Sequence, residues 1–402
     1  MIYIVSKNPG SIYLLKLNII KPRRTELIYL LITILSIGLQ WYTHGFGLLK
    51  THDSYQYLSA AHSLSTSHSL VDQNGHHFLF WPPLFPIILS AIPNAEQTLV
   101  WVNMLITLSI AVVVYLLIKR FIKNLILAIL CFVQIMLSVH LLLISTFLWS
   151  ELIFLFLTVL FIHQLLQKPV SALSFYIAIG LGFLLCLQRN AGFFIVTGGA
   201  IWTWVSEIQS NKKYLNALLL LTGGTSGGLV WNIYVWTSFP HHHIGLSNEL
   251  FQYAYHNLQV LLAATVNLVL PVPVFTILIF TILALLIVLV LKNELRSKAP
   301  IQLLLLLSAT YFLFFGLVLT INITGSKIDI GEGDRFISVI SPFLHMLIFK
   351  STEVICAKFN PKFRLVVYIV ICCWMSYPIV RTVRNAHQWH LVSLKKYSQS
   401  LD

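Results

Sequence analysis

The sequence predicts an all-α protein that crosses a membrane many times. Of its 402 residues, 57% are hydrophobic and only 10% are charged, and the mean hydropathy is +0.83. A soluble protein of this length carries far more charge on its surface. Apolar runs of about 20 residues, enough to cross ~30 Å of hydrocarbon as helices, recur along the chain. We therefore expect a single integral-membrane domain, residues 1–402, with about eleven transmembrane helices.

The spans are placed between the polar breaks, and the distribution of Lys and Arg gives their orientation. With the N-terminus in the cytoplasm, 18 of the 26 basic residues fall on the cytoplasmic side, as the positive-inside rule requires. Residues 381–402 then form a short outer C-terminal tail. The predicted spans are 26–46, 98–118, 124–145, 148–166, 171–187, 191–206, 214–236, 260–291, 300–321, 336–350 and 365–380.

The first outer loop, residues 47–97, is long and patterned. Apolar residues recur at helical spacing after Asp53, which predicts an amphipathic helix lying in the membrane interface. Asn74-Gly75 then predicts a turn, and Pro82-Pro83 favour the start of a second short surface helix. The apolar positions of the first helix are Tyr57, Leu58, Ala61 and Leu64, and its polar positions are Gln56, Ser59 and Ser63.

Acidic residues concentrate on the predicted outer side, where nine of the thirteen Asp and Glu residues fall. Acidic residues contribute little to topology, so this asymmetry needs another cause, and chemistry at the outer face is one candidate. The nine are Asp53, Asp72, Glu96, Glu151, Glu249, Asp329, Glu332, Asp334 and Asp402.

Asp53, in "HDSYQYLSAA", has two interpretations. With Gln56 three residues later it fits a capping box, in which Asp53 is the N-cap of a helix. A carboxylate held at a helix start also suits a catalytic base, so both interpretations stay open.

Four other charged residues at the predicted outer edge are candidates. Glu151 opens the span of "SELIF", where an acid is costly and either is wetted by interfacial water or faces a cavity or partner. Arg189 lies in the turn "QRNAG" and suits snorkelling or phosphate binding. Asp334 and Arg335 in "GEGDRF" lie at the mouth of the tenth span, where they either pair with each other or take part in a site.

Three further motifs have simpler explanations. The run His241–His243 suggests a metal ligand set, but consecutive histidines point in different directions and no paired acid motif accompanies them. "TGGTSGG" (222–228) lacks the Gly-Lys-Ser/Thr end of a phosphate loop and lies in a span, where small residues let helices approach closely. Asn322-Ile323-Thr324 fits an N-glycosylation acceptor.

The order of these motifs resembles the GT-C superfamily of membrane glycosyltransferases. More narrowly, it resembles the bacterial relatives of protein O-mannosyltransferases and of the lipid A aminoarabinose transferase. The likeness covers residues 26 to about 350 and rests on five features in one order. These are the acid after the first span, "PPLFP" (82–86), "SELIF" (150–154), "QRNAGFFIV" (188–196) and "DRFISVISPF" (334–343).

The resemblance implies roles for individual residues. Asp53 matches the acid of the first outer loop and is the candidate catalytic base, while Arg189 and Arg335 match positions suited to the phosphate of a lipid donor. Relatives often pair two acids in the first loop, whereas here His52 precedes Asp53 and Ser54 follows it. The remaining candidates for the substrate site are His52, Tyr57, Glu151, Asn190 and Asp334.

The resemblance also implies the reaction and its partners. A sugar would pass from a polyprenyl-phosphate donor to a lipid, glycan or protein acceptor at the outer face of a bacterial cytoplasmic membrane, in an inverting step. It implies no certain cofactor and leaves a divalent cation open. Nucleic acid is not expected as a partner, because the basic residues are scattered over six loops and can contact only anionic headgroups.

Three alternatives compete with this function. A lipid-linked sugar transporter or flippase would place ionisable residues and broken helices near the middle of the membrane. An oligosaccharide polymerase or ligase would carry a large arginine-rich outer loop late in the chain, whereas the large loop here comes first. A structural scaffold would leave the acidic residues at the outer edge unexplained.

Overall fold

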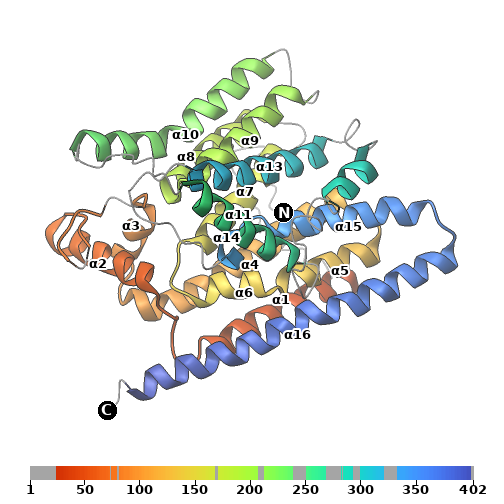
Figure 1. Cartoon of the computed structure of the whole chain (residues 1–402), viewed down its shortest axis with the longest axis horizontal. Helices are drawn as coiled ribbons and strands as arrows, with labels where there is room; N and C mark the ends of the chain where they lie inside the picture. Colours follow the sequence, from red (N-terminus) through yellow and green to blue (C-terminus); the bar gives the residue numbers. More distant parts are fainter. Residues whose placement is uncertain are drawn as a thin grey trace, which may run out of the picture.

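The computed structural model shows a bundle of helices (Figure 1). It describes residues 24–399 apart from 73, 79–80, 168–170, 207–211, 239–249, 269–281, 283, 293–298 and 321–332. Within these ranges there is no β-strand, only isolated bridges between Leu49 and Phe147 and between Val71 and His77. The predicted all-α fold is confirmed. His241–His243, Asn322–Thr324 and much of the predicted span 260–291 lie outside the described residues.

Five helical stretches are long and apolar enough to cross a membrane, and several shorter apolar helices lie among them. The five are α1 (Arg24–Thr43), α4 (Ala95–Phe121), the pair α5 (Leu125–Met136) and α6 (Val139–Thr146), α10 (Lys213–Ser238), and α16 (Pro361–Gln399). This is the pattern of a multi-pass membrane protein. The other helices are α2 (His52–Ser67), α3 (Leu84–Ser90), α7 (Glu151–Leu165), α8 (Ala172–Gln188), α9 (Gly192–Val205), α11 (Leu250–Val266), α13 (Ala299–Thr320), α14 (Gly333–Ile337) and α15 (Ser341–Ala357).

The predicted span 124–145 is broken in two. Helix α5 ends at Met136 and α6 begins at Val139. Ser138 makes the break, because its hydroxyl caps α6 and accepts a hydrogen bond from the Leu141 N–H at 3.1 Å. A serine that bonds the backbone locally competes with continuous helix, which is why an apolar run of this length does not stay regular.

The last helix is longer than predicted. We expect a span over 365–380 followed by a tail, but α16 has 39 residues and continues to Gln399 with Pro378 inside it. Its length is about 58 Å, well beyond the ~30 Å of hydrocarbon. In Figure 1 it runs beside α1, against which it packs. Residues 381–399 are therefore a helical extension.

Small residues let α8, α9 and α10 approach closely. A Cβ on Gly182 would lie 3.0 Å from the Gly224 Cα, and one on Gly228 would lie 2.6 Å from the Phe193 ring. The prediction that the glycine-rich run of α10 serves packing is confirmed. Close helix contacts of this kind are typical of membrane bundles.

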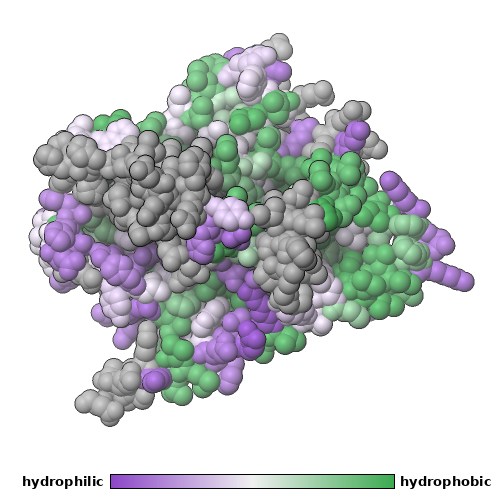
Figure 2. Space-filling view, viewed as in Figure 1, coloured by the Kyte–Doolittle hydropathy of each residue, from purple (hydrophilic) through white to green (hydrophobic). Residues whose placement is uncertain are grey.

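The surface separates by polarity along the long axis. In Figure 2, hydrophilic residues gather over α2 at one end and near the turn between α15 and α16 at the other, with apolar residues over the first part of α16. On that part Leu365, Val366, Ile369 and Val370 are each more than half exposed. Exposed apolar side chains in a continuous row are what a lipid-facing helix presents.

Candidate functional site

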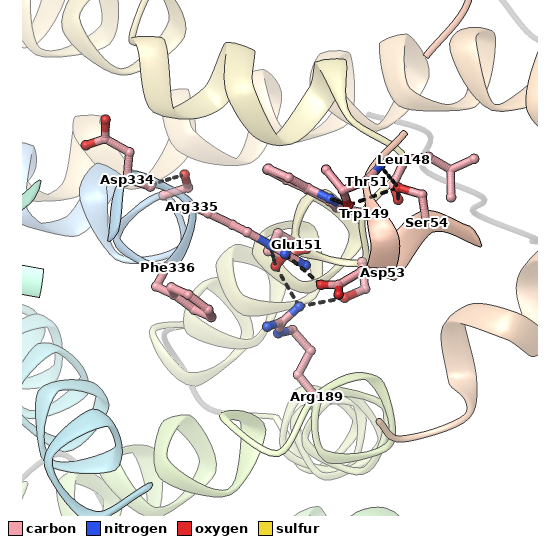
Figure 3. A network of polar contacts seen from close by, with 12 residues as sticks. Thr51, Asp53, Ser54, Leu148, Trp149, Glu151, Arg189, Asp334, Arg335 and Phe336 are labelled. Atoms are coloured by element: carbon pink, nitrogen blue, oxygen red, sulfur yellow. Dashed lines mark hydrogen bonds and ion pairs between the residues drawn. The ribbon is translucent and has the colours of Figure 1, made fainter. Parts of the chain in front are cut away.

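Four charged side chains from four helices meet at one place (Figure 3). Arg335 of α14 donates from Nη1 to the Asp53 Oδ2 at 2.7 Å and from Nε to the Glu151 Oε1. Arg189, at the end of α8, places its Nη1 2.7 Å from the same Glu151 oxygen. We call Asp53, Glu151, Arg189 and Arg335 the four-charge cluster. These four residues lie far apart in the sequence, and the fold brings them together.

The four members differ in exposure, and the difference separates their roles. The Glu151 side chain is 1% exposed and that of Arg335 is 8%, whereas Arg189 is 14% and Asp53 is 22% exposed. Glu151 therefore sits inside as the shared counter-ion of two guanidinium groups, and its Oε2 has no hydrogen-bond partner among the described residues. Asp53 is the carboxylate that reaches toward solvent.

Backbone pairing brings the first turns of α2 and α7 together. The Leu49 N–H donates to the Thr146 carbonyl at 3.0 Å, and the Leu148 N–H donates to the Leu49 carbonyl at 2.9 Å. Ser54 adds a side-chain link, donating from Oγ to the Leu148 carbonyl at 2.9 Å. The segment before α2 is thus paired with the segment before α7, which places Asp53 beside Glu151.

The capping interpretation of Asp53 is wrong in detail. The N-cap of α2 is Thr51, whose N–H donates to the Ser54 Oγ at 2.9 Å, so that Asp53 is the second helical residue. Gln56 is buried, and so is Ser63, whose hydroxyl donates to the Ser69 carbonyl at 2.8 Å. The predicted polar face of α2 is therefore partly an inner face, because these polar groups find partners within the loop.

Helix ends favour the negative charges of the cluster. Asp53 lies in the first turn of α2 and Glu151 is the first residue of α7. Each helix N-terminus carries the positive end of the peptide dipole, which stabilises a nearby carboxylate by about 0.3–1 kcal/mol. Both carboxylates therefore lie where a helix terminus favours negative charge.

Arg189 is aimed by a tight turn between α8 and α9. Its N–H donates to the Leu185 carbonyl at 3.0 Å and ends α8. A Cβ on Gly192 would lie 2.5 Å from the Leu185 carbonyl carbon, so only glycine permits this approach. The Arg189 Nη1 also donates to the Ser150 Oγ at 2.7 Å, beside its contact with Glu151.

Arg335 lies against an aromatic ring. Its guanidinium carbon is 4.1 Å from the centroid of the Trp149 ring, a cation–π contact worth about 0.5–2 kcal/mol. The indole N–H of Trp149 donates to the Thr51 Oγ1 at 2.8 Å, which fixes the ring. The same tryptophan thus ties the cap of α2 to the arginine of α14.

Tyr57 lies beneath the cluster and is buried at 1% exposure. Its hydroxyl is 3.4 Å from the Ser150 Oγ, and its ring packs edge-on against Phe85 at 4.9 Å. Burial raises the pKa of Tyr57 to about 12. Its hydroxyl is therefore protonated at neutral pH and available as a hydrogen-bond donor.

The remaining predicted residues are not members of the cluster. Asp334 points away from it in Figure 3 and bonds the Arg381 Nη2 at 2.5 Å and approaches the His140 Nε2 at 3.4 Å. It does not pair with Arg335, as one interpretation of the sequence had it. His52 is exposed one residue before Asp53, and Asn190 is exposed one residue after Arg189.

Sequence reasoning missed Trp149, Ser150 and Arg381. Ser150 and Trp149 directly precede Glu151, so the "LWSE" string held a signal: a hydroxyl and an indole next to an acid at a membrane edge. Arg381 gave none, because its role depends on where α16 passes. No group of three His, Cys, Asp or Glu residues in the described part of the chain is arranged to hold a metal ion.

A groove of about 540 Å³ opens beside α2 but not at the cluster. It is lined by residues of α2, by the segment from α3 to α4, and by the start of α4. None of the four clustered charges lines it. We assign it no role in the reaction.

Comparisons with known proteins support the fold. No protein-family model matches the sequence, and no curated protein matches it. Among solved structures, the chain is similar to ArnT from Cupriavidus metallidurans bound to undecaprenyl phosphate, with 11% identity and a TM-score of 0.52 over 92% of this chain and 76% of that one. The Archaeoglobus fulgidus oligosaccharyltransferase, in its complex with zinc and sulfate, gives 14% identity and a TM-score of 0.48 over 89% of this chain and 53% of that one.

The likeness to ArnT shows a shared fold. At this identity it does not by itself transfer an activity. The expected GT-C fold of a polytopic, all-α membrane protein is confirmed, and the function is argued from the site.

Proposed function

We propose that this protein is a membrane glycosyltransferase that moves a sugar from a polyprenyl-phosphate donor to an acceptor at the outer face of the membrane. The observation that carries the proposal is the four-charge cluster. Two guanidinium groups and two carboxylates from α2, α7, α8 and α14 meet there in a protein with the fold of a lipid-linked sugar transferase. The membrane would be the cytoplasmic membrane of a bacterium.

The two arginines suit the leaving group. When the bond between sugar and phosphate breaks, negative charge collects on the phosphate, and fixed cations nearby stabilise that transition state. Guanidinium groups bind phosphate oxygens through two parallel N–H bonds. Arg189 and Arg335 lie on either side of Glu151, so that one phosphate can contact both.

Asp53 suits the role of base better than Glu151 does. A general base must reach the acceptor hydroxyl within hydrogen-bond distance. Glu151 is enclosed by two arginines, while Asp53 is the most exposed member of the cluster and bonds to Arg335. An arriving phosphate would compete for Arg335 and release Asp53 to accept the proton. With a single base, the acceptor oxygen attacks the anomeric carbon from the side opposite the leaving phosphate, so the configuration at that carbon is inverted.

A second observation supports a lipid phosphate as the sugar carrier. The ArnT structure, whose fold this chain shares, is bound to undecaprenyl phosphate. A long isoprenoid donor also fits a chain with exposed apolar helices on its surface. We take undecaprenyl phosphate as the donor's carrier, and the acceptor as a lipid, glycan or protein.

The test is the substitution Asp53→Asn in purified protein in nanodiscs. We would supply a panel of undecaprenyl-phosphate sugars with labelled sugar and a membrane extract as acceptor, and measure transferred label and released undecaprenyl phosphate. Asp53→Asn should lower the rate by about 10²–10⁴-fold, because it removes the proton acceptor. Asp72→Asn is the matched control, since Asp72 is an acid of the same loop that caps a turn, lies 3.8 Å from His76 and is not a member of the cluster.

The arginines give a second arm to the same experiment. Arg189→Ala should weaken binding of undecaprenyl phosphate more than it weakens use of the acceptor. Wild-type turnover by Asp53→Asn, or equal losses for donor and acceptor in Arg189→Ala, would overturn the proposal. Movement of intact lipid-linked sugar across the bilayer, without cleavage, would instead identify a flippase.

A further inference from the structure

The C-terminal half of α16, residues 381–399, contacts α14 and the segments that lead into α7 and α2. Helix α16 runs beside α1 and passes α6 (Figure 1). None of its residues belongs to the cluster. Its contacts reach α14, which carries Arg335, and two segments that lead into the cluster. These are the loop before α7, which precedes Glu151, and the segment between α1 and α2, which precedes Asp53.

The first contact lies behind Arg335. Helix α14 has only five residues and cannot hold its own orientation. Its neighbouring residues Asp334 and Arg335 point to opposite sides (Figure 3). Asp334 is bonded to the Arg381 Nη2 at 2.5 Å, and Arg381 Nη1 also approaches the Asn267 carbonyl at 3.5 Å. Arg381 thus anchors α14 from the side opposite the cluster.

The second contact reaches Arg335 from its other side through three rings. Trp389 of α16 packs edge-on against Phe147, with centroids 5.9 Å apart and ring planes at 85°. Phe147 stacks on Trp149 at 4.4 Å and 15°. Trp149 carries the guanidinium of Arg335 at 4.1 Å. The rings form a continuous series of contacts from α16 to the cluster.

The third contact holds the segment that leads into α2. His390 stacks on Tyr42 at 4.3 Å and its Nδ1 is 2.7 Å from the Tyr42 carbonyl. The Tyr42 hydroxyl is 2.9 Å from the His387 Nδ1. Ser393 donates to the Gly47 carbonyl at 3.5 Å, a few residues before Thr51.

We propose that the C-terminal half of α16 is a positioning element for Arg335, acting chiefly through Arg381 and Trp389. This inference rests on the proposed function, in which Arg335 binds the donor phosphate. Arg381 and Trp389 are not members of the cluster. Arg381 bonds Asp334, the residue before Arg335, and Trp389 reaches the Arg335 guanidinium through Phe147 and Trp149. A guanidinium that shifts by about 1 Å loses much of its effect on a transition state.

The experiment compares Arg381→Ala with Arg384→Ala, an exposed arginine three residues on in the same helix. Donor turnover gives kcat and KM, and hydrogen exchange follows residues 333–337 and 147–151. Arg381→Ala should lower kcat/KM by about 10- to 100-fold and speed exchange in those two segments. Arg381→Lys should restore part of the activity, and Arg384→Ala should change neither measurement.

A coupling test separates positioning from general stability. In an Arg335→Lys background, adding Arg381→Ala should lower kcat/KM by less than twofold, because the residue it positions is already altered. A general loss of stability would multiply the two effects. Trp389→Leu supplies a second variant and should show the same coupling with a smaller loss.

The outcomes distinguish this inference from the proposed function. Unchanged exchange in 333–337 and 147–151 on Arg381→Ala, or multiplicative losses in the double variant, would overturn the positioning role whatever the reaction is. If the wild type transfers no sugar while Arg381→Ala speeds hydrogen exchange in those segments, the proposed reaction is wrong. The positioning of α14 by α16 is then still supported.

Discussion

Two acid–arginine contacts flank α14, and they differ in a way that distinguishes a site from an anchor. On one side Arg335 contacts two carboxylates, and one of these, Glu151, is shared with a second arginine. On the other side Asp334 pairs with Arg381, with His140 nearby. The Asp334 side chain is 30% exposed, whereas Glu151 is 1% exposed.

The difference teaches where a ligand can act. Asp334 and Arg381 form an ion pair between one carboxylate and one guanidinium at a partly solvated position. A pair of this kind serves to hold two helices together. In the four-charge cluster, the Arg335 guanidinium bonds to two carboxylates, the buried Glu151 and the more exposed Asp53. A phosphate can take the place of the exposed acid without stranding the buried one. Exchange of partners is the property that a binding site needs.

The largest effect should come from removing the buried shared acid. Glu151→Ala leaves two arginines without their common counter-ion in a buried place, which costs about 3–5 kcal/mol of stability. Asp334→Ala breaks a more exposed contact and should cost about 1–2 kcal/mol. Thermal unfolding in detergent micelles, followed by intrinsic fluorescence, measures both.

Glu151→Gln is the matched control, because it keeps the shape and one acceptor oxygen. It should be less damaging to stability than Glu151→Ala. If Glu151→Ala and Asp334→Ala lowered stability equally, the distinction between a buried shared acid and a partly exposed anchor would be lost.

Much of the fold and the membership of the cluster could be predicted from the sequence. Length and apolar content of the runs decide transmembrane helices, since few other structures tolerate them. Asp53, Glu151, Arg189 and Arg335 stood out because a charge at a membrane edge is costly and needs a reason. The predicted topology places all four on the outer side of the membrane.

The distances, and which of two adjacent residues belongs to the cluster, could not be predicted. Asp334 and Arg335 are adjacent in the sequence and look alike as candidates, yet α14 turns them to opposite sides. Thr51, not Asp53, caps α2, because Ser54 rather than Gln56 completes the local bonding. Arg381 reaches Asp334 only because α16 continues past residue 380, where the sequence pattern predicts that the last span ends. Each of these depends on tertiary packing, which local propensity does not contain.

A moderate effect should follow when Arg189 alone is displaced. Gly192→Ala puts a Cβ 2.5 Å from the backbone of Leu185, so the turn must open, at a cost of about 1–3 kcal/mol. The shift moves Arg189 and leaves the Asp334–Arg381 contact in place. We expect weaker binding of undecaprenyl phosphate, measured by titration in nanodiscs.

Gly180→Ala, in the preceding helix α8, is the control, because a Cβ there meets nothing within 4 Å. It should leave lipid binding unchanged. Undiminished binding by Gly192→Ala would mean that the position of Arg189 does not matter to the cluster, and would favour Arg335 as the sole phosphate contact.

The smallest effect concerns Tyr57, a buried residue whose hydroxyl approaches Ser150, the residue before Glu151. Its pKa is about 12 because burial disfavours the phenolate, against 10.0 in the unfolded chain. Unfolding therefore releases a proton between these values. The stability that Tyr57 contributes is complete below pH 10 and is lost as the pH rises through about 12. Tyr57→Phe should cost less than about 1 kcal/mol at pH 8, since the bond to Ser150 is long at 3.4 Å.

The measurement is the difference in unfolding temperature between wild type and Tyr57→Phe from pH 8 to pH 11. Taking the difference cancels the other groups that titrate in this range. We expect the wild type to lose its advantage progressively above pH 10, whereas Tyr176→Phe, at an exposed ring, should show no such trend. A pH-independent difference would mean that the Tyr57 hydroxyl is solvated in the folded protein. Water would then reach the four-charge cluster from the side of Tyr57 as well as from the outer side, contrary to the burial of Glu151.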